Sequence, residues 1–226
     1  MKAEYVYHID EIPKEEDCKV GIVVSLNRRA KLSHCGVAYN IHDTLRILHL
    51  ATHKDIRVDD DWGHFLVWVK PNIPTMFQEA MIPFFEVIET KITAGAYHVP
   101  YGFKYENYST FDRNGDLTLG KGSKGLSCST YVITLFHSLG IDLVDIQNWP
   151  SRKEDLPWYA FIIDIFANNG MSNDFIEGLK KEIGAPRFRP EETAVSSALM
   201  KGGPAEYTDI WAHGKELLEY LYQITK

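Results

Sequence analysis

Long apolar runs are missing from this 226-residue chain, and their absence limits the classes of protein to which it can belong. No stretch approaches the ~20 apolar residues that a membrane-spanning helix needs. Residues 161–166 come nearest, but Asp164 interrupts them. Residues 1–10 lack the apolar segment of a secretory signal peptide. We therefore expect a cytoplasmic protein with no stable membrane insertion, or one exported by a route that needs no N-terminal signal.

Clusters of basic residues are also missing. The chain has 24 Lys and Arg against 31 Asp and Glu, a formal net charge of −7. Apart from the mixed segment Arg187-Phe188-Arg189, no Lys/Arg cluster is longer than a pair. Proteins that bind the phosphate backbone of nucleic acids carry a basic face. We expect no nucleic-acid partner.

Cysteine is scarce, with Cys18, Cys35 and Cys128 only. An odd and small number in a chain of this length does not indicate a disulfide framework. It is typical of a reducing compartment, where a lone cysteine is either structural or catalytic. No two cysteines have the spacing of zinc ligands. The sequence predicts no metal and no organic cofactor.

The predicted secondary structure changes from strands to helices along the chain. Short strands rich in β-branched residues are predicted first, one long helix follows, and the last third is mostly helical. We expect strands at 19–26, 34–41, 46–52, 56–58 and 65–69, with a turn at 42–44, and helices at 75–93, 158–167, 173–183, 190–200 and 206–224. Pro83 should kink or split the first of these helices. This order indicates an α+β fold with an antiparallel sheet.

The stretch 125–140 carries the strongest chemical signal. A glycine-rich loop ends at Ser127, and Val132, Leu135 and Phe136 then recur at helical spacing as far as Gly140. Cys128 is therefore predicted at a helix N-terminus, where free N–H groups and the helix dipole favour a thiolate. The alternative is a buried cysteine that packs as a small apolar residue.

A nucleophilic thiolate needs a base, and two histidines upstream suit that role. His34 opens one predicted strand and His49 lies in the next, so pairing across the turn would place them side by side on one face. His53 is a rival for the third position. Cys35 should point away from His34, into the core. A metal site that uses His42, His49, His53 and His64 is a weaker alternative, because His49 and His53 lie on a predicted strand and turn rather than on a helix.

These motifs resemble those of the NlpC-type papain-like cysteine peptidases and amidases. Ser-Cys128-Ser-Thr-Tyr-Val resembles the nucleophile motif, His34-Cys-Gly-Val-Ala-Tyr and Ile-Leu-His49-Leu the two histidine strands, and Pro-Tyr101-Gly the tyrosine segment. Histidine precedes cysteine here, as in the circularly permuted branch of YiiX-like and lecithin:retinol acyltransferase-like enzymes. Ser127 and Thr130 depart from the common aspartate and glycine.

The resemblance covers about residues 19–140. It implies a permuted papain-like core within 1–140, in which the sheet packs on the nucleophile helix, and a helical extension at 141–226 packed on that core. It further implies Cys128 as nucleophile, His34 as base and His49 as orienting group, with Tyr101, Ser127 and Ser129 near the substrate.

The expected activity is hydrolysis of a peptide or another amide through an acyl-enzyme, with a small peptide, amide or ester as substrate. Ester or lipid hydrolysis, or acyl transfer, is the first alternative. An apolar groove built from Phe84, Phe85 and Trp158 would favour it. A non-catalytic binding module with Cys128 buried is the second alternative.

Overall fold

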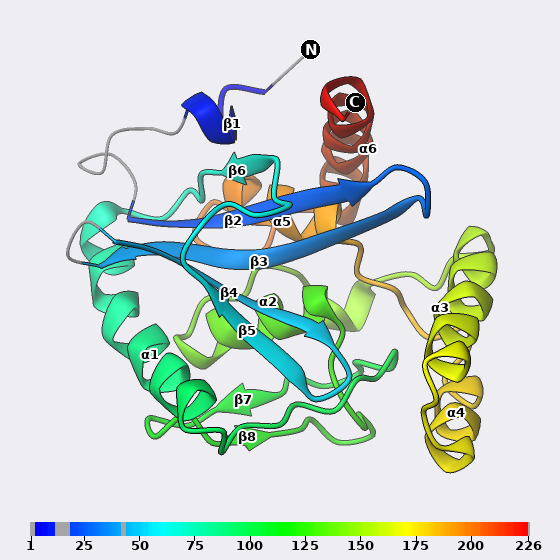
Figure 1. Cartoon of the computed structure of the whole chain (residues 1–226). Coiled ribbons are helices and arrows are strands. Elements are labelled where there is room, and N and C mark those ends of the chain that lie inside the picture. Colours follow the sequence, from blue (N-terminus) through cyan, green and yellow to red (C-terminus); the bar gives the residue numbers. More distant parts are fainter. Residues whose placement is uncertain (1–2, 12–18, 42–43, 226) are drawn as a thin grey trace.

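A six-stranded antiparallel sheet forms the centre of the protein, in the order β1-β6-β2-β3-β4-β5. The computed structural model describes residues 3–11, 19–41 and 44–225 (Figure 1). The strands of this sheet are β1 (Val6–His8), β2 (Val20–Asn27), β3 (Leu32–Ile41), β4 (Thr44–Thr52), β5 (Asp55–Asp59) and β6 (Val67–Val69). A separate hairpin pairs β7 (Thr110–Phe111) with β8 (Leu117–Thr118).

The α-helices are α1 (Thr75–Thr93), α2 (Cys128–Ser138), α3 (Leu156–Asn168), α4 (Asn173–Lys180), α5 (Pro190–Leu199) and α6 (Tyr207–Ile224), and short 3-10 turns lie at Ile9–Glu11, Ile146–Asn148 and Lys153–Asp155. The mixed α and β composition agrees with the predicted fold class, and each predicted helix and strand has a counterpart. In the described ranges, no helix combines the length and apolar character needed to cross a membrane.

The two faces of the sheet carry different cores. Alternate residues such as Ile22, Val24, Val37 and Leu48 face α1, α2 and α5 and form the main core, as the period-two pattern of β-branched residues requires. The opposite face carries a smaller cluster around Trp68.

Pro83 does not split α1, which runs without a break from Thr75 to Thr93. A proline inside a helix removes the hydrogen bond to the carbonyl four residues earlier, here that of Glu79. Both residues are exposed, and water can therefore satisfy the free carbonyl. The predicted turn at 42–44 includes two residues outside the described ranges.

The C-terminal helices occupy two different places. Helix α5 is buried against β2, β3, β6 and α2, and α6 packs on its outer side. Helices α3 and α4 form a separate pair at one side of the molecule (Figure 1), with their own apolar cluster that includes Phe103. This pair stands beside the end of the sheet where the predicted site residues lie.

Candidate active site

Cys128 is the first residue of α2, as predicted. Ser127 caps the helix: its hydroxyl accepts the N–H of Thr130, and the Thr130 hydroxyl accepts the N–H of Ser127. This reciprocal arrangement fixes the helix start, and it accounts for both departures from the common motif. The N–H groups of Cys128 and Ser129 donate no hydrogen bond within the described chain, so two free donors flank the sulfur.

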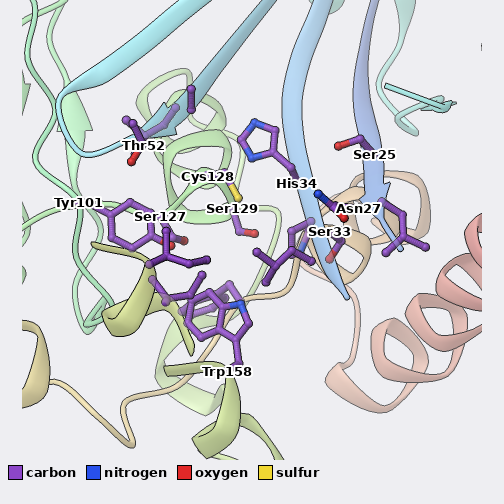
Figure 2. A pocket seen from close by; sticks show the side chains of 18 of the residues that line it. Ser25, Asn27, Ser33, His34, Thr52, Tyr101, Ser127, Cys128, Ser129 and Trp158 are labelled. Atoms are coloured by element: carbon purple, nitrogen blue, oxygen red, sulfur yellow. The ribbon is translucent and has the colours of Figure 1, made fainter. Parts of the chain in front are cut away.

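Two glycines bring Tyr101 beside the loop that precedes Cys128. Tyr101 and Leu126 form an isolated parallel bridge. A Cβ on Gly102 would lie 2.8 Å from the Gly125 nitrogen, and one on Gly125 would lie 2.4 Å from the Pro100 oxygen. Such close backbone contact requires glycine on both sides. The ring of Tyr101 consequently reaches the same cavity as Cys128 (Figure 2).

His34 and His49 lie side by side, as their strand positions predict. The Nε2 of His34 is 2.8 Å from the Nδ1 of His49. The β3–β4 ladder ends at Val37 opposite Leu48, and Gly36, the next residue, lies against the Cβ of His49. Since Gly36 has no side chain, His49 can lean across it toward His34.

Asp59 follows His34 and His49 as the third side chain in a row of hydrogen bonds. The Nε2 of His49 is 3.0 Å from the Asp59 Oδ2 on β5. A carboxylate accepts hydrogen bonds, so Nε2 of His49 carries the proton and its Nδ1 accepts from Nε2 of His34. The remaining nitrogen of His34, Nδ1, is then free to take a proton from a nucleophile. Figure 2 shows the His34 ring and the Cys128 sulfur facing the same space.

Burial keeps His49 neutral. The pKa of His49 is lowered to about 4, mainly by burial and also by the neighbouring His34, whereas Asp59 acts in the opposite direction. His49 is only 1% exposed, so the desolvation of its charged form dominates. A neutral His49 can accept the hydrogen bond from His34 over the physiological pH range.

The surroundings of Cys128 favour its thiolate. The interaction with the Cys35 thiol holds the pKa of Cys128 well below its usual value; burial opposes this, and the charge of His34 and a hydrogen bond with it add to the lowering. Cys35 is fully buried, as expected for a side chain facing the core, and burial raises its pKa. Cys35 therefore stays protonated beside the Cys128 sulfur, and its Sγ is 3.8 Å from the Ser129 Oγ.

These residues open onto a cavity of about 540 Å³ between the sheet end and α3. The lining combines polar and apolar side chains, and Figure 2 shows Trp158 across the space from His34 and Thr52. The polar residues include His34, Thr52, His64, Ser127, Cys128 and Ser129, and the apolar residues include Leu32, Trp158, Ile162, Ile165, Phe166 and Phe188.

Two alternatives that the sequence left open do not fit the cavity. Phe84 and Phe85 do not line it, because they belong to α1, where Phe85 packs against Tyr39 in the main core. His53 is not the third residue: its Nδ1 accepts the N–H of Tyr101, and its ring contacts Phe175. Trp158 does line the cavity, as do Tyr101, Ser127 and Ser129.

Sequence reasoning did not assign Asp59, His64 or Arg187 to the site around Cys128. In the β4–β5 ladder His49 pairs with Arg57, and Asp59 lies two residues further along β5. The one sequence feature that pointed to Asp59 was the short strand predicted at 56–58, directly before it. His64 enters from the loop before β6, with its ring 5.8 Å from that of His34. Within the described residues, no three His, Cys, Asp or Glu side chains are grouped as metal ligands, and His42 lies outside them.

No family model matches the chain, and comparisons with curated proteins and with solved structures also found no match.

Proposed function

We propose that the protein is a cysteine hydrolase that cleaves an amide bond, with Cys128 as nucleophile and His34 as base. The observation that carries this proposal is the line of contacts from His34 to His49 and Asp59, beside a cysteine at a helix N-terminus. A nucleophile, a base and a group that orients the base are the parts that acyl transfer to a side chain requires.

The proposed reaction begins when Nδ1 of His34 takes the Cys128 proton, and Nε2 of His34 donates to His49. The thiolate attacks the substrate carbonyl carbon, and the oxyanion accepts hydrogen bonds from the free N–H groups of Cys128 and Ser129. The His34 imidazolium then protonates the leaving amine as the C–N bond breaks. Water, deprotonated by His34, attacks the thioester, and the acid leaves as Cys128 regains its proton.

The order of these elements supports a permuted papain-like arrangement. The base and its partners lie on three consecutive strands, β3, β4 and β5, and the nucleophile helix α2 follows and packs on β3 and β4. This is the order of the circularly permuted branch that the sequence motifs resemble. We therefore also propose that the chain is related to the circularly permuted papain-like hydrolases.

A second function, hydrolysis or transfer of an ester-linked acyl chain, is favoured by the apolar side chains that line the cavity around Cys128. Trp158, Ile162 and Phe166 would receive an acyl chain rather than a polar peptide. Thioester, ester and amide probes of equal acyl length separate the two functions, because a peptidase must also turn over the amide. Mass spectrometry of the acylated Cys128 gives the readout.

Thiol alkylation tests the proposed dyad directly. At mildly acidic pH, iodoacetamide should label Cys128 faster than a free thiol in solution, and His34→Ala should slow that labelling. His98→Ala is the matched control, since His98 is an exposed histidine away from the cavity. A Cys128 that reacts no faster than the free thiol would leave the non-catalytic binding module as the better description.

A further inference from the structure

Arg187 brings a guanidinium to the wall of the cavity that holds Cys128. Of the described residues that line the space around Cys128, it is the only Lys, Arg, Asp or Glu. It stands out further because the chain as a whole has a net charge of −7. Tyr101 interacts electrostatically with both Cys128 and Arg187, so the guanidinium and the nucleophile lie within range of one ring.

A cluster of buried ions holds Arg187 in place. Asp155 is 1% exposed, and its Oδ1 accepts hydrogen bonds from Arg187 Nη1 at 2.9 Å and from Arg189 Nη2 at 2.9 Å. Its other oxygen accepts from Arg152, which also pairs with Glu192. Three guanidinium groups thus share two carboxylates, and one positive charge is left without a partner inside the cluster.

The geometry indicates that Arg187 carries this excess charge toward the cavity. Its guanidinium lies 3.9 Å from the centre of the Trp158 ring, which holds the plane in a fixed orientation. Its Nε is buried and has no hydrogen-bond partner, and among the described contacts Nη2 has none either. Glu191, the nearest further carboxylate along the chain, accepts from Ser33 and does not line the cavity.

We propose that Arg187 forms a binding subsite for an anionic group, a carboxylate or a phosphate, on the substrate of Cys128. Nη1 of Arg187 is held by Asp155, so the unpartnered Nη2 donates to either group, and the guanidinium charge strengthens that hydrogen bond. The substrate class is an acyl compound with an apolar body, which contacts Trp158 and Ile162, and an anionic end at Arg187. This inference deepens the proposed function and rests on it.

Paired alkylating probes test the subsite on the full-length protein. N-iodoacetyl derivatives of straight-chain ω-amino acids of increasing length are compared as free carboxylates and as carboxamides. An N-iodoacetyl aminoalkyl phosphate and its alcohol form the phosphate arm. Second-order rates of Cys128 alkylation are divided by the rates of the same probes with a free thiol, which removes differences in intrinsic reactivity.

At one spacer length the anionic probe should react about tenfold faster or more than its neutral partner. Arg187→Gln should lower this ratio to one or below, because the thiolate then repels anions; the readout is the ratio of the two probes, which cancels any change common to both. Arg187→Lys should retain part of the preference. Arg113→Gln, which removes an exposed arginine elsewhere, should leave the ratio unchanged.

The outcomes separate the subsite from the chemistry. A preference in only one of the two arms assigns the subsite to carboxylate or to phosphate. A ratio of one or below at every spacer length in the unmodified protein overturns the subsite, whatever happens to the folding of the variants. If the anionic probe still reacts faster than its neutral partner in Arg187→Gln, the subsite at Arg187 is also overturned. Slow alkylation by the neutral probes overturns the proposed function itself and this inference with it.

Discussion

The Cβ of His49 lies 2.9 Å from the position that a Cβ on Gly36 would occupy, which is closer than two such atoms can approach. The substitution Gly36→Ala should therefore displace His49 and break its contact with His34. We expect the rate of Cys128 acylation to fall roughly tenfold or more, as when the third residue of a catalytic triad is misplaced. The measurement is the acylation rate of the variant with an activated ester.

The matched control is Gly178→Ala, because nothing lies within 4 Å of a Cβ at that position in α4. Alanine in a helix interior is about 0.5–1 kcal/mol more favourable than glycine, so this variant should gain stability and keep its rate. Equal acylation rates for the Gly36 and Gly178 variants would show that His49 is not needed beside His34.

Asp59 should determine which nitrogen of His49 carries the proton. In Asp59→Asn the amide can donate as well as accept, so His49 can adopt the other tautomer and lose its acceptor for His34. We expect kcat to fall roughly tenfold or more, with KM nearly unchanged. Asp60→Asn removes the neighbouring, exposed carboxylate and should have no such effect. A drop of equal size in both variants would indicate a general loss of negative charge.

The burial of His49 should make the fold less stable in acid. The pKa of His49 is about 4 in the native state against 6.5 for an ordinary histidine. Between these values the unfolded chain binds more protons, so the free energy of unfolding falls as the pH drops below 6.5. The loss is complete below about 4 and amounts to about 3 kcal/mol for this group. Denaturant titrations across this pH range measure it.

In His49→Gln the same titrations should show a shallower pH dependence. Some slope should remain, because the pKa values of His53 and His64 are also lowered, mainly by burial. An unchanged slope would mean that His49 is protonated equally easily in the folded and unfolded states.

Cys35 should help to keep Cys128 ionised. Its buried thiol is the largest influence that lowers the pKa of Cys128. In Cys35→Ala the pH midpoint of Cys128 alkylation should therefore move upward. Cys35→Ser keeps a hydrogen-bond donor of similar size and should preserve more of the low midpoint. A midpoint that is the same in all three proteins would leave His34 and the helix terminus as the whole cause.

Local patterns in the sequence predicted most of the helices and strands, the position of Cys128 at a helix start, and the contact between His34 and His49. The start of α2 at Cys128 follows from a loop, a capping serine and apolar residues at helical spacing. The meeting of His34 and His49 follows from two predicted strands and a short turn. In each case the decisive interactions lie within a few residues, or between neighbouring strands, where periodicity fixes the facing side.

The parts that escaped prediction depend on contacts between distant segments. In the sequence Asp59 appeared only as the residue after a short predicted strand. Its contact with His49 depends on the register of β5 against β4, which the sequence pattern does not determine. Arg187 reaches the cavity because Asp155 and Trp158 hold it. Phe84 and Phe85 fit an apolar groove by composition, but the position of α1 against the sheet turns Phe85 into the core.

The order of the site residues along the chain has a consequence for how the protein becomes reactive during synthesis. The pair His34 and His49 can meet as soon as one hairpin closes, which requires only a short loop. The helix that carries Cys128 has to wait for long-range packing, and α5, which lies beneath β2 and β3, emerges much later. Under the proposed function, a nascent chain therefore carries an ordinary thiol at Cys128 until α2 has packed against β3, the strand that bears Cys35 and His34.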